Sequence, residues 1–179
     1  ELKFSFIIFI YIIYKYFNLK KKKILIIMNP EIYCINLKNR NEKRKFMKNQ
    51  CKRRKINIKF HIVELHKNPK QGCINSHFEI IKIAKERNLP YVLILEDDAK
   101  IIKNINKIPK PPQKWDMLYL GGYIKEIFSE YDENWDKMSS WCTHAYIINQ
   151  SIYDVVLNNF DDWKKKILDP DKIAIDEYY

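Results

Sequence analysis

The chain has 179 residues, of which 46% are hydrophobic and 14% aromatic, enough for one domain with a buried core. Its only glycines are Gly72, Gly121 and Gly122, which excludes a glycine-rich phosphate-binding loop. The formal charge of +11 invites a nucleic-acid interpretation. However, +5 of it lies in residues 1–27 (six lysines less one glutamate), and the remainder is spread along the chain. We therefore predict a solvated basic surface and no nucleic-acid partner.

An apolar and aromatic stretch, residues 4–17, is followed by four lysines at residues 20–23. A membrane-spanning helix needs about 20 apolar residues, and this stretch is shorter. Two interpretations stay open. In the first, residues 4–17 associate with a membrane, and the lysines hold the protein on the cytoplasmic side. In the second, the protein itself starts at Met28, and residues 1–27 are translated from the sequence upstream of that start. The predicted localisation is accordingly cytoplasmic, or membrane-associated and facing the cytoplasm.

A single domain is predicted over residues 28–179, and its abrupt end leads us to expect a truncated C-terminus. Its first strand is predicted at Glu31–Leu37. Asn41 is the expected N-cap of a helix over residues 42–54. Alternating apolar and polar side chains predict a second strand over residues 58–63.

The next part of the chain is predicted as a loop over residues 69–72, a helix over residues 73–87 and a strand over residues 91–95. The strand reads Tyr-Val-Leu-Ile-Leu, which has the length and aliphatic content of a strand buried on both faces. Strands that alternate with helices in this way favour an α/β fold with a mostly parallel sheet.

Three consecutive acids, Glu96, Asp97 and Asp98, follow that strand directly. An unpaired carboxylate is very costly to bury, so these side chains must meet water, a cation or a charged ligand. In open α/β sheets, ligands bind just beyond the carboxyl ends of the strands. Acids there can hold a divalent metal against phosphate oxygens. The alternative is that they only favour the dipole of a following helix.

The last third of the domain contains two more predicted strands and one more helix. A proline-rich loop over residues 108–112 precedes a strand over residues 116–120. Residues 123–139 are polar and are predicted to be irregular. A further strand over residues 141–148 and a helix over residues 151–160 complete the pattern.

The four cysteines, Cys34, Cys51, Cys73 and Cys142, contain no C-x-x-C pair. This spacing favours buried free thiols in a reducing compartment. It argues against a structural zinc site.

Four landmarks occur in order along the chain. They are Ile35-Asn36-Leu37 with Arg40 and Arg44; Gly72-Cys73-Ile74-Asn75-Ser76-His77; Leu93-Ile94-Leu95-Glu96-Asp97-Asp98-Ala99; and Trp115 to Gly121, trailed by His144 to Ile148 and Asp176. This ordered set resembles glycosyltransferase family 25, which includes lipooligosaccharide and collagen galactosyltransferases. The resemblance covers residues 31–179.

The resemblance implies a GT-A fold, a Rossmann-like α/β/α sandwich that binds a nucleoside-diphosphate sugar. It implies inverting transfer of galactose or glucose from a UDP-sugar to a glycan or protein hydroxyl, with Mn²⁺ (or Mg²⁺) as cofactor, and a role in lipopolysaccharide biosynthesis. The alternative is a non-catalytic nucleotide-sugar or carbohydrate binding relic of the same fold.

The acidic triplet looks like the family's metal-binding motif, and Asp98 is the first candidate for coordination, with Glu96 and His144 as further ligands. The candidate catalytic base is Asp176; Asp132 and Glu133 are alternatives. The candidate donor-binding residues are Asn36, Arg40, Arg44, Ser76, His77, Glu96 and Asp97. Each of the histidines and arginines also has an ordinary structural interpretation, as a packing residue or a solvated helix start.

Overall fold

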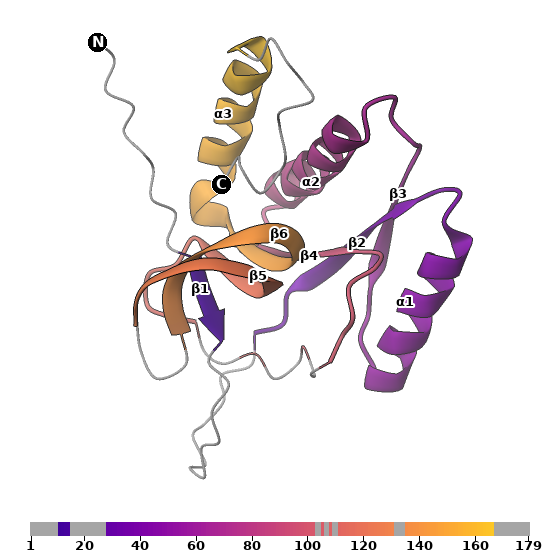
Figure 1. Ribbon diagram of the computed structural model, residues 1–179, viewed down its shortest axis with the longest axis horizontal. Coiled ribbons are helices and arrows are strands. Elements are labelled where there is room, and N and C mark those ends of the chain that lie inside the picture. Colours follow the sequence, from indigo (N-terminus) through magenta and orange to yellow (C-terminus); the bar gives the residue numbers. More distant parts are fainter. Residues whose placement is uncertain are drawn as a thin grey trace.

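A six-stranded sheet with helices on both faces forms the centre of the protein (Figure 1). The computed structural model describes residues 11–14, 28–102, 105, 108, 111–130 and 135–166. The strands are β1 (Tyr11–Tyr14), β2 (Glu31–Leu37), β3 (Lys59–Val63), β4 (Tyr91–Glu96), β5 (Met117–Glu130) and β6 (Trp135–Asn149). The helices are α1 (Asn41–Arg54), α2 (Pro69–Glu86), the 3₁₀ turn η2 (Gln150–Ile152) and α3 (Tyr153–Lys166).

The sheet is mixed, and its order is β1-β5-β6-β4-β2-β3. β2 runs parallel to both β3 and β4. β6, however, lies antiparallel to both β4 and β5. The expectation of a mostly parallel sheet is therefore wrong. The reason is that β5 and β6 are joined by residues 131–134 alone, and a connection this short can only return the chain as an antiparallel strand.

The long hairpin of β5 and β6 replaces most of the irregular segment predicted over residues 123–139. Its two strands pair from Met117 with Ile148 to Glu130 with Asp136, with several register shifts. β1 pairs with the beginnings of both strands, parallel to β5 and antiparallel to β6. Three strands thus form the half of the sheet farthest from β3.

The two faces of the sheet carry separate hydrophobic clusters. Along β4, Val92 and Ile94 belong to the cluster under α2 and α3, whereas Leu93 and Leu95 belong to the cluster on the α1 side. All four side chains are buried. This alternation explains why β4 reads as a continuous apolar run, and it establishes three layers with helices on both faces of the sheet (Figure 1).

The N-termini of two helices differ from the predictions. α2 begins at Pro69, one turn earlier than expected, so residues 69–72 are helical and not a loop. The side chain of Asn68 accepts a hydrogen bond from the Gln71 amide at 3.1 Å, and proline is favourable at the first helical position. α1 begins at Asn41 after Arg40, without a side-chain cap, so the expected capping role of Asn41 is wrong.

Cys34 and Cys51 are buried and form no disulfide, as predicted, while the Cys142 side chain lies outside the described residues. No helix within the described residues has the length and apolarity needed to cross a membrane. Of residues 4–17, the structure describes only Tyr11–Tyr14, which form β1. The remainder of residues 1–27, and residues 167–179, lie outside the described part of the chain.

Candidate functional site

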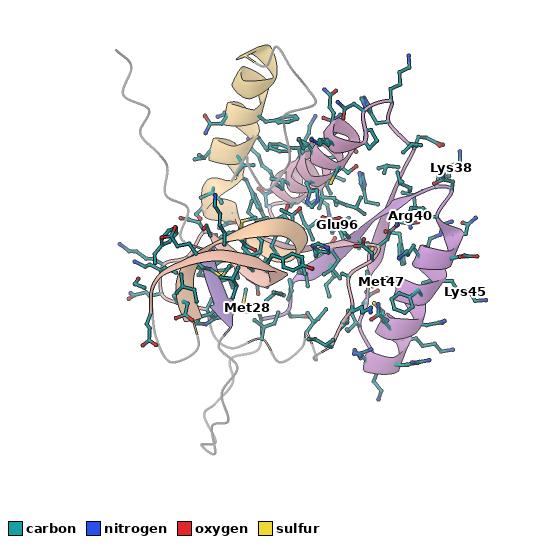
Figure 2. All side chains as sticks on the ribbon, in the orientation of Figure 1. Met28, Lys38, Arg40, Lys45, Met47 and Glu96 are labelled. Atoms are coloured by element: carbon teal, nitrogen blue, oxygen red, sulfur yellow. The ribbon has the colours of Figure 1, made fainter. Side chains whose placement is uncertain are left out.

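A cavity of about 200 Å³ opens beside the carboxyl ends of β2, β3 and β4, next to the first two turns of α2. Its polar lining includes Arg40, Ser76, Glu96 and Asp97. Figure 2 labels Glu96 at the end of β4 and Arg40 just after β2. Two acids of the triplet therefore reach an open cavity at the sheet edge where the sequence predicts a ligand site.

Asp97 is almost fully buried, with 4% of its side chain exposed, and both of its carboxylate oxygens are occupied. Arg40 Nη1 lies 2.9 Å from Oδ1, and the Asn36 amide donates to Oδ2 at 2.8 Å. The same amide group also donates to the Arg40 carbonyl at 3.2 Å. Asp97 thus fastens the turn after β4 to the turn after β2, and it holds Arg40 at the cavity.

Asn36 itself is completely buried and does not line the cavity. The sequence predicts that Asn36 contacts the donor, whereas the structure places its side-chain amide against the buried carboxylate of Asp97. Arg40 is different, because 40% of its side chain remains exposed and it borders the cavity. Of the residues expected after β2, Arg40 is therefore the one placed to meet an anionic ligand.

Glu96 lies at the junction of β4, α2 and β6, with 27% of its side chain exposed. Its Oε1 accepts a hydrogen bond from the Thr143 hydroxyl at 3.1 Å and lies 3.7 Å from His77 Nε2. Burial would raise the pKa of Glu96, but the neighbouring His77, His144 and Thr143 side chains outweigh it and lower that pKa below its ordinary value. Glu96 is therefore a carboxylate at neutral pH.

His77 is completely buried on α2. Its Nδ1 is 2.8 Å from the Tyr146 hydroxyl, and the two rings stack at 5.6 Å between centroids. Within the described residues, Nε2 has no hydrogen-bond partner. One ring nitrogen is thus held in place, while the other faces Glu96.

The expected metal ligands do not all converge. Asp98 is exposed in the turn after β4 and does not line the cavity, and His144 is half-buried on β6. The described residues contain one group of at least three potential ligands whose ligand atoms lie within 4.8 Å of one another, namely Cys73, His77 and Glu96. The structure therefore leaves Asp98 out of the cavity wall and brings Glu96 next to His77 on α2.

Two more expected residues have clear positions. Ser76 lines the cavity, and its hydroxyl donates to the Gly72 carbonyl at 2.7 Å. Arg44 hydrogen-bonds the Asn41 side chain on α1 and does not border the cavity. The candidate base Asp176, and its alternatives Asp132 and Glu133, lie outside the described residues.

Sequence reasoning missed Cys73, Thr143 and Tyr146 as members of this site. Cys73 and His77 are four residues apart, a spacing that places them on one face of a helix and could have been noticed. The contributions of Thr143 and Tyr146 depend on β6 lying next to β4, which no local pattern reveals.

The comparison with curated proteins gives no match. The model of glycosyltransferase family 25, described as an LPS biosynthesis protein family, matches residues 64–152. The match spans α2, β4 and the strand segment that carries Thr143 and Tyr146, and so includes most of the cavity wall. Residues 64–152 of this chain therefore belong to glycosyltransferase family 25.

Proposed function

We propose that this protein transfers a hexose, galactose or glucose, from a UDP-sugar to a hydroxyl group of a glycan or protein acceptor. The family match supports glycosyl transfer in general. The observation that carries the finer proposal is the cavity at the carboxyl ends of β2 and β4, which both Arg40 and Glu96 line. A three-layer fold with its ligand cavity at this edge is what a GT-A-type domain would present.

Arg40 is our candidate for the donor's diphosphate. Its guanidinium has several donors, and the 2.9 Å contact with Asp97 engages Nη1. The remaining donors on a partly exposed side chain can pair with phosphate oxygens. A volume of about 200 Å³ is below the roughly 300–1,000 Å³ of ordinary ligand pockets. We therefore assign to it only part of the donor, the diphosphate and sugar, with the uridine toward its open side.

Asp98 is the candidate ligand for Mn²⁺ or Mg²⁺. It is an exposed carboxylate directly after β4, and such cations need only one or two protein carboxylates when phosphates supply further oxygens. His144 on β6 is a second candidate, because its Nδ1 is buried without a hydrogen-bond partner among the described residues. When bound, the cation would neutralise charge on the departing UDP. The carboxylate of Asp98 fits a hard divalent cation that is shared with a phosphate ligand.

An inverting transfer also needs a base that removes the proton from the acceptor hydroxyl. We keep Asp176 as the candidate for that role. Glu96 has a different task in this proposal, because its carboxylate is already held by Thr143 next to His77. It would form part of the cavity wall and give that wall a negative charge.

Thermal unfolding with UDP, UDP-galactose and UDP-glucose, each with and without Mn²⁺, tests the proposal. A ligand at about 100 times its Kd stabilises the native state by about 2.7 kcal/mol, which is measurable as a rise in Tm. We expect the rise to need both nucleotide and Mn²⁺. Asp98→Asn should abolish the part that depends on Mn²⁺, while Asp154→Asn, an exposed aspartate on α3, should retain it.

Two results would count against the proposal. If Asp98→Asn keeps the full Mn²⁺-dependent rise, Asp98 is not the ligand. If no UDP-sugar raises Tm, the donor class is wrong. Release of UDP from a UDP-sugar in the presence of acceptor glycans distinguishes an enzyme from a protein of the same fold that only binds the donor.

A further inference from the structure

Cys73 and His77 lie one turn apart on the face of α2 that meets the sheet. Residues four positions apart on a helix project to the same side, so the two side chains are neighbours. Cys73 borders the cavity, and His77 lies completely buried. Glu96, at the end of β4, completes the group, and its carboxylate, the thiol and the imidazole have ligand atoms within 4.8 Å of one another.

The buried Nε2 of His77 is the observation that points to a ligand. A polar atom buried without a hydrogen bond is costly, and proteins generally avoid one. Within the described residues this nitrogen has no such partner, and the nearest carboxylate oxygen, Oε1 of Glu96, lies 3.7 Å away. That separation is too long for a hydrogen bond. Two atoms that bind one tetrahedral zinc ion at about 2.1 Å lie about 3.4 Å apart, which is close to the observed separation.

Both ligands are held by further hydrogen bonds. The Tyr146 hydroxyl lies 2.8 Å from His77 Nδ1, and the Thr143 hydroxyl donates to Glu96 Oε1 at 3.1 Å. In the tautomer that binds a metal, Nδ1–H donates to Tyr146 and the lone pair of Nε2 is left for the cation. Histidines that bind metals have their other ring nitrogen fixed in this manner, and ligating carboxylates are likewise hydrogen-bonded.

We infer that Cys73, His77 and Glu96 form a three-ligand site for a divalent cation of the zinc class at the wall of the cavity. Sulfur and imidazole ligands favour Zn²⁺ or Co²⁺, whereas Mn²⁺ and Mg²⁺ prefer oxygen. Three protein ligands leave a fourth position open. Because Cys73 and Glu96 both border the cavity, that position faces it and would take water or an oxygen atom of an anion.

This site is separate from the proposed Mn²⁺ site, since it does not use Asp98. It also does not depend on the proposed function. The spacing of the cysteines argues against a zinc site made by cysteines alone. The site inferred here differs from such a site, because it combines Cys73 and His77 on one helix with the Glu96 carboxylate from a neighbouring strand.

Titration of the metal-free protein with Co²⁺ tests the inference. Four-coordinate Co²⁺ bound to a thiolate gives intense visible bands and a sulfur-to-cobalt charge-transfer band. We expect one Co²⁺ per chain with these bands, displaced by one equivalent of Zn²⁺. Cys73→Ala should abolish the charge-transfer band, and because Cys73 is only half-buried this variant should keep its fold, as circular dichroism would verify.

Cys51→Ala is the matched control, because Cys51 is a buried thiol on α1, away from the cavity. It should bind Co²⁺ with an unchanged spectrum, as should Asp98→Asn. The inference is overturned if the wild-type protein gives no charge-transfer band, if Cys73→Ala retains it, or if Cys51→Ala loses it equally. None of these results bears on the nucleotide-dependent rise in Tm, so the two proposals fail independently.

Discussion

Asp97 and Arg40, 57 positions apart in the sequence, form an ion pair at 2.9 Å that joins the turn after β4 to the turn after β2. The pair lies at the cavity, and its acid is buried while its base is partly exposed. Removal of the base would leave a buried carboxylate without its counter-charge.

Arg40→Ala should therefore lower the free energy of unfolding by about 1–3 kcal/mol, a value below that of a fully buried pair because water reaches the guanidinium. Urea denaturation measures this change. Arg44→Ala is the matched control, because Arg44 hydrogen-bonds the Asn41 side chain on its own helix and does not pair with Asp97, and we expect a change within about 0.5 kcal/mol. Equal losses in the two variants would contradict the structural role of the pair.

The Tyr146 hydroxyl should contribute to stability through His77. Tyr146→Phe removes the partner of a buried ring nitrogen, at an expected cost of about 1–3 kcal/mol in unfolding free energy. Tyr153→Phe is the control, since the Tyr153 hydroxyl is buried without a hydrogen-bond partner among the described residues, and burial raises its pKa. Its removal should leave stability unchanged or improved. A larger loss in Tyr153→Phe than in Tyr146→Phe would be inconsistent with this assignment.

Glu31 lies at the end of the sheet opposite the cavity, and it should make the free energy of unfolding depend on pH. The hydrogen bond from Arg87 lowers the pKa of Glu31 from 4.5 to about 2, against the opposing effect of burial and with help from Lys59. Because the folded pKa is depressed, the stabilisation is complete above pH 4.5 and is lost as the pH falls toward 2. Unfolding free energies of the wild type and Glu31→Gln should therefore converge over this window.

Arg87→Gln removes the main cause of the lowered pKa of Glu31. The variant should therefore lose less stability than the wild type as the pH falls from 4.5 to about 2. Arg87 Nη2 donates to Glu31 Oε2 at 2.8 Å, so the variant deletes a defined contact. A difference between wild type and Glu31→Gln that stays constant from pH 6 to pH 2 would show that this carboxylate has no depressed pKa.

Gly72 is required by a close contact with the loop before α2. A Cβ atom at Gly72 would lie 2.6 Å from the Cβ of His66, well inside van der Waals contact. Helix propensity alone favours alanine by about 1 kcal/mol, but overpacking costs about 1–3 kcal/mol, so Gly72→Ala should destabilise by up to about 2 kcal/mol. Gly121→Ala is the control, because its Cβ would meet Ala145 at an ordinary 3.8 Å. A thermal melt in which Gly72→Ala is as stable as Gly121→Ala would contradict the contact.

The parallel half of the sheet could be predicted because its signals are local. β2 matches its predicted bounds, and the apolar run before Glu96 is long enough to indicate a strand buried on both faces. The β5–β6 hairpin could not be predicted, because β5 is exposed over residues 122–130 and therefore lacks the alternation of a strand with one buried face. The direction of β6 was also hidden, since an apolar run reads alike in parallel and antiparallel strands.

The parts of the candidate site that follow from a residue's position along the chain could be predicted. The parts that depend on contacts between distant strands and helices could not. Glu96 and Asp97, at the end of β4, reach the expected sheet edge, and Arg40 lines the same cavity. Which acid is buried could not be read from the triplet, because it is decided by Asn36 and Arg40 from another strand and turn. Likewise, the neighbours of His77 come from β4 and β6.

The central place of β4 has a consequence for biosynthesis. β4 pairs with β2 on one side and with residues 145–149 of β6 on the other, and its residues 92–95 are buried in the finished protein. A ribosome completes β4 long before it releases the end of β6. The growing chain therefore carries an unpaired, aliphatic strand edge for part of its synthesis, and such edges invite association between nascent copies. Chaperones that cover β4 during this interval would raise the yield of folded protein.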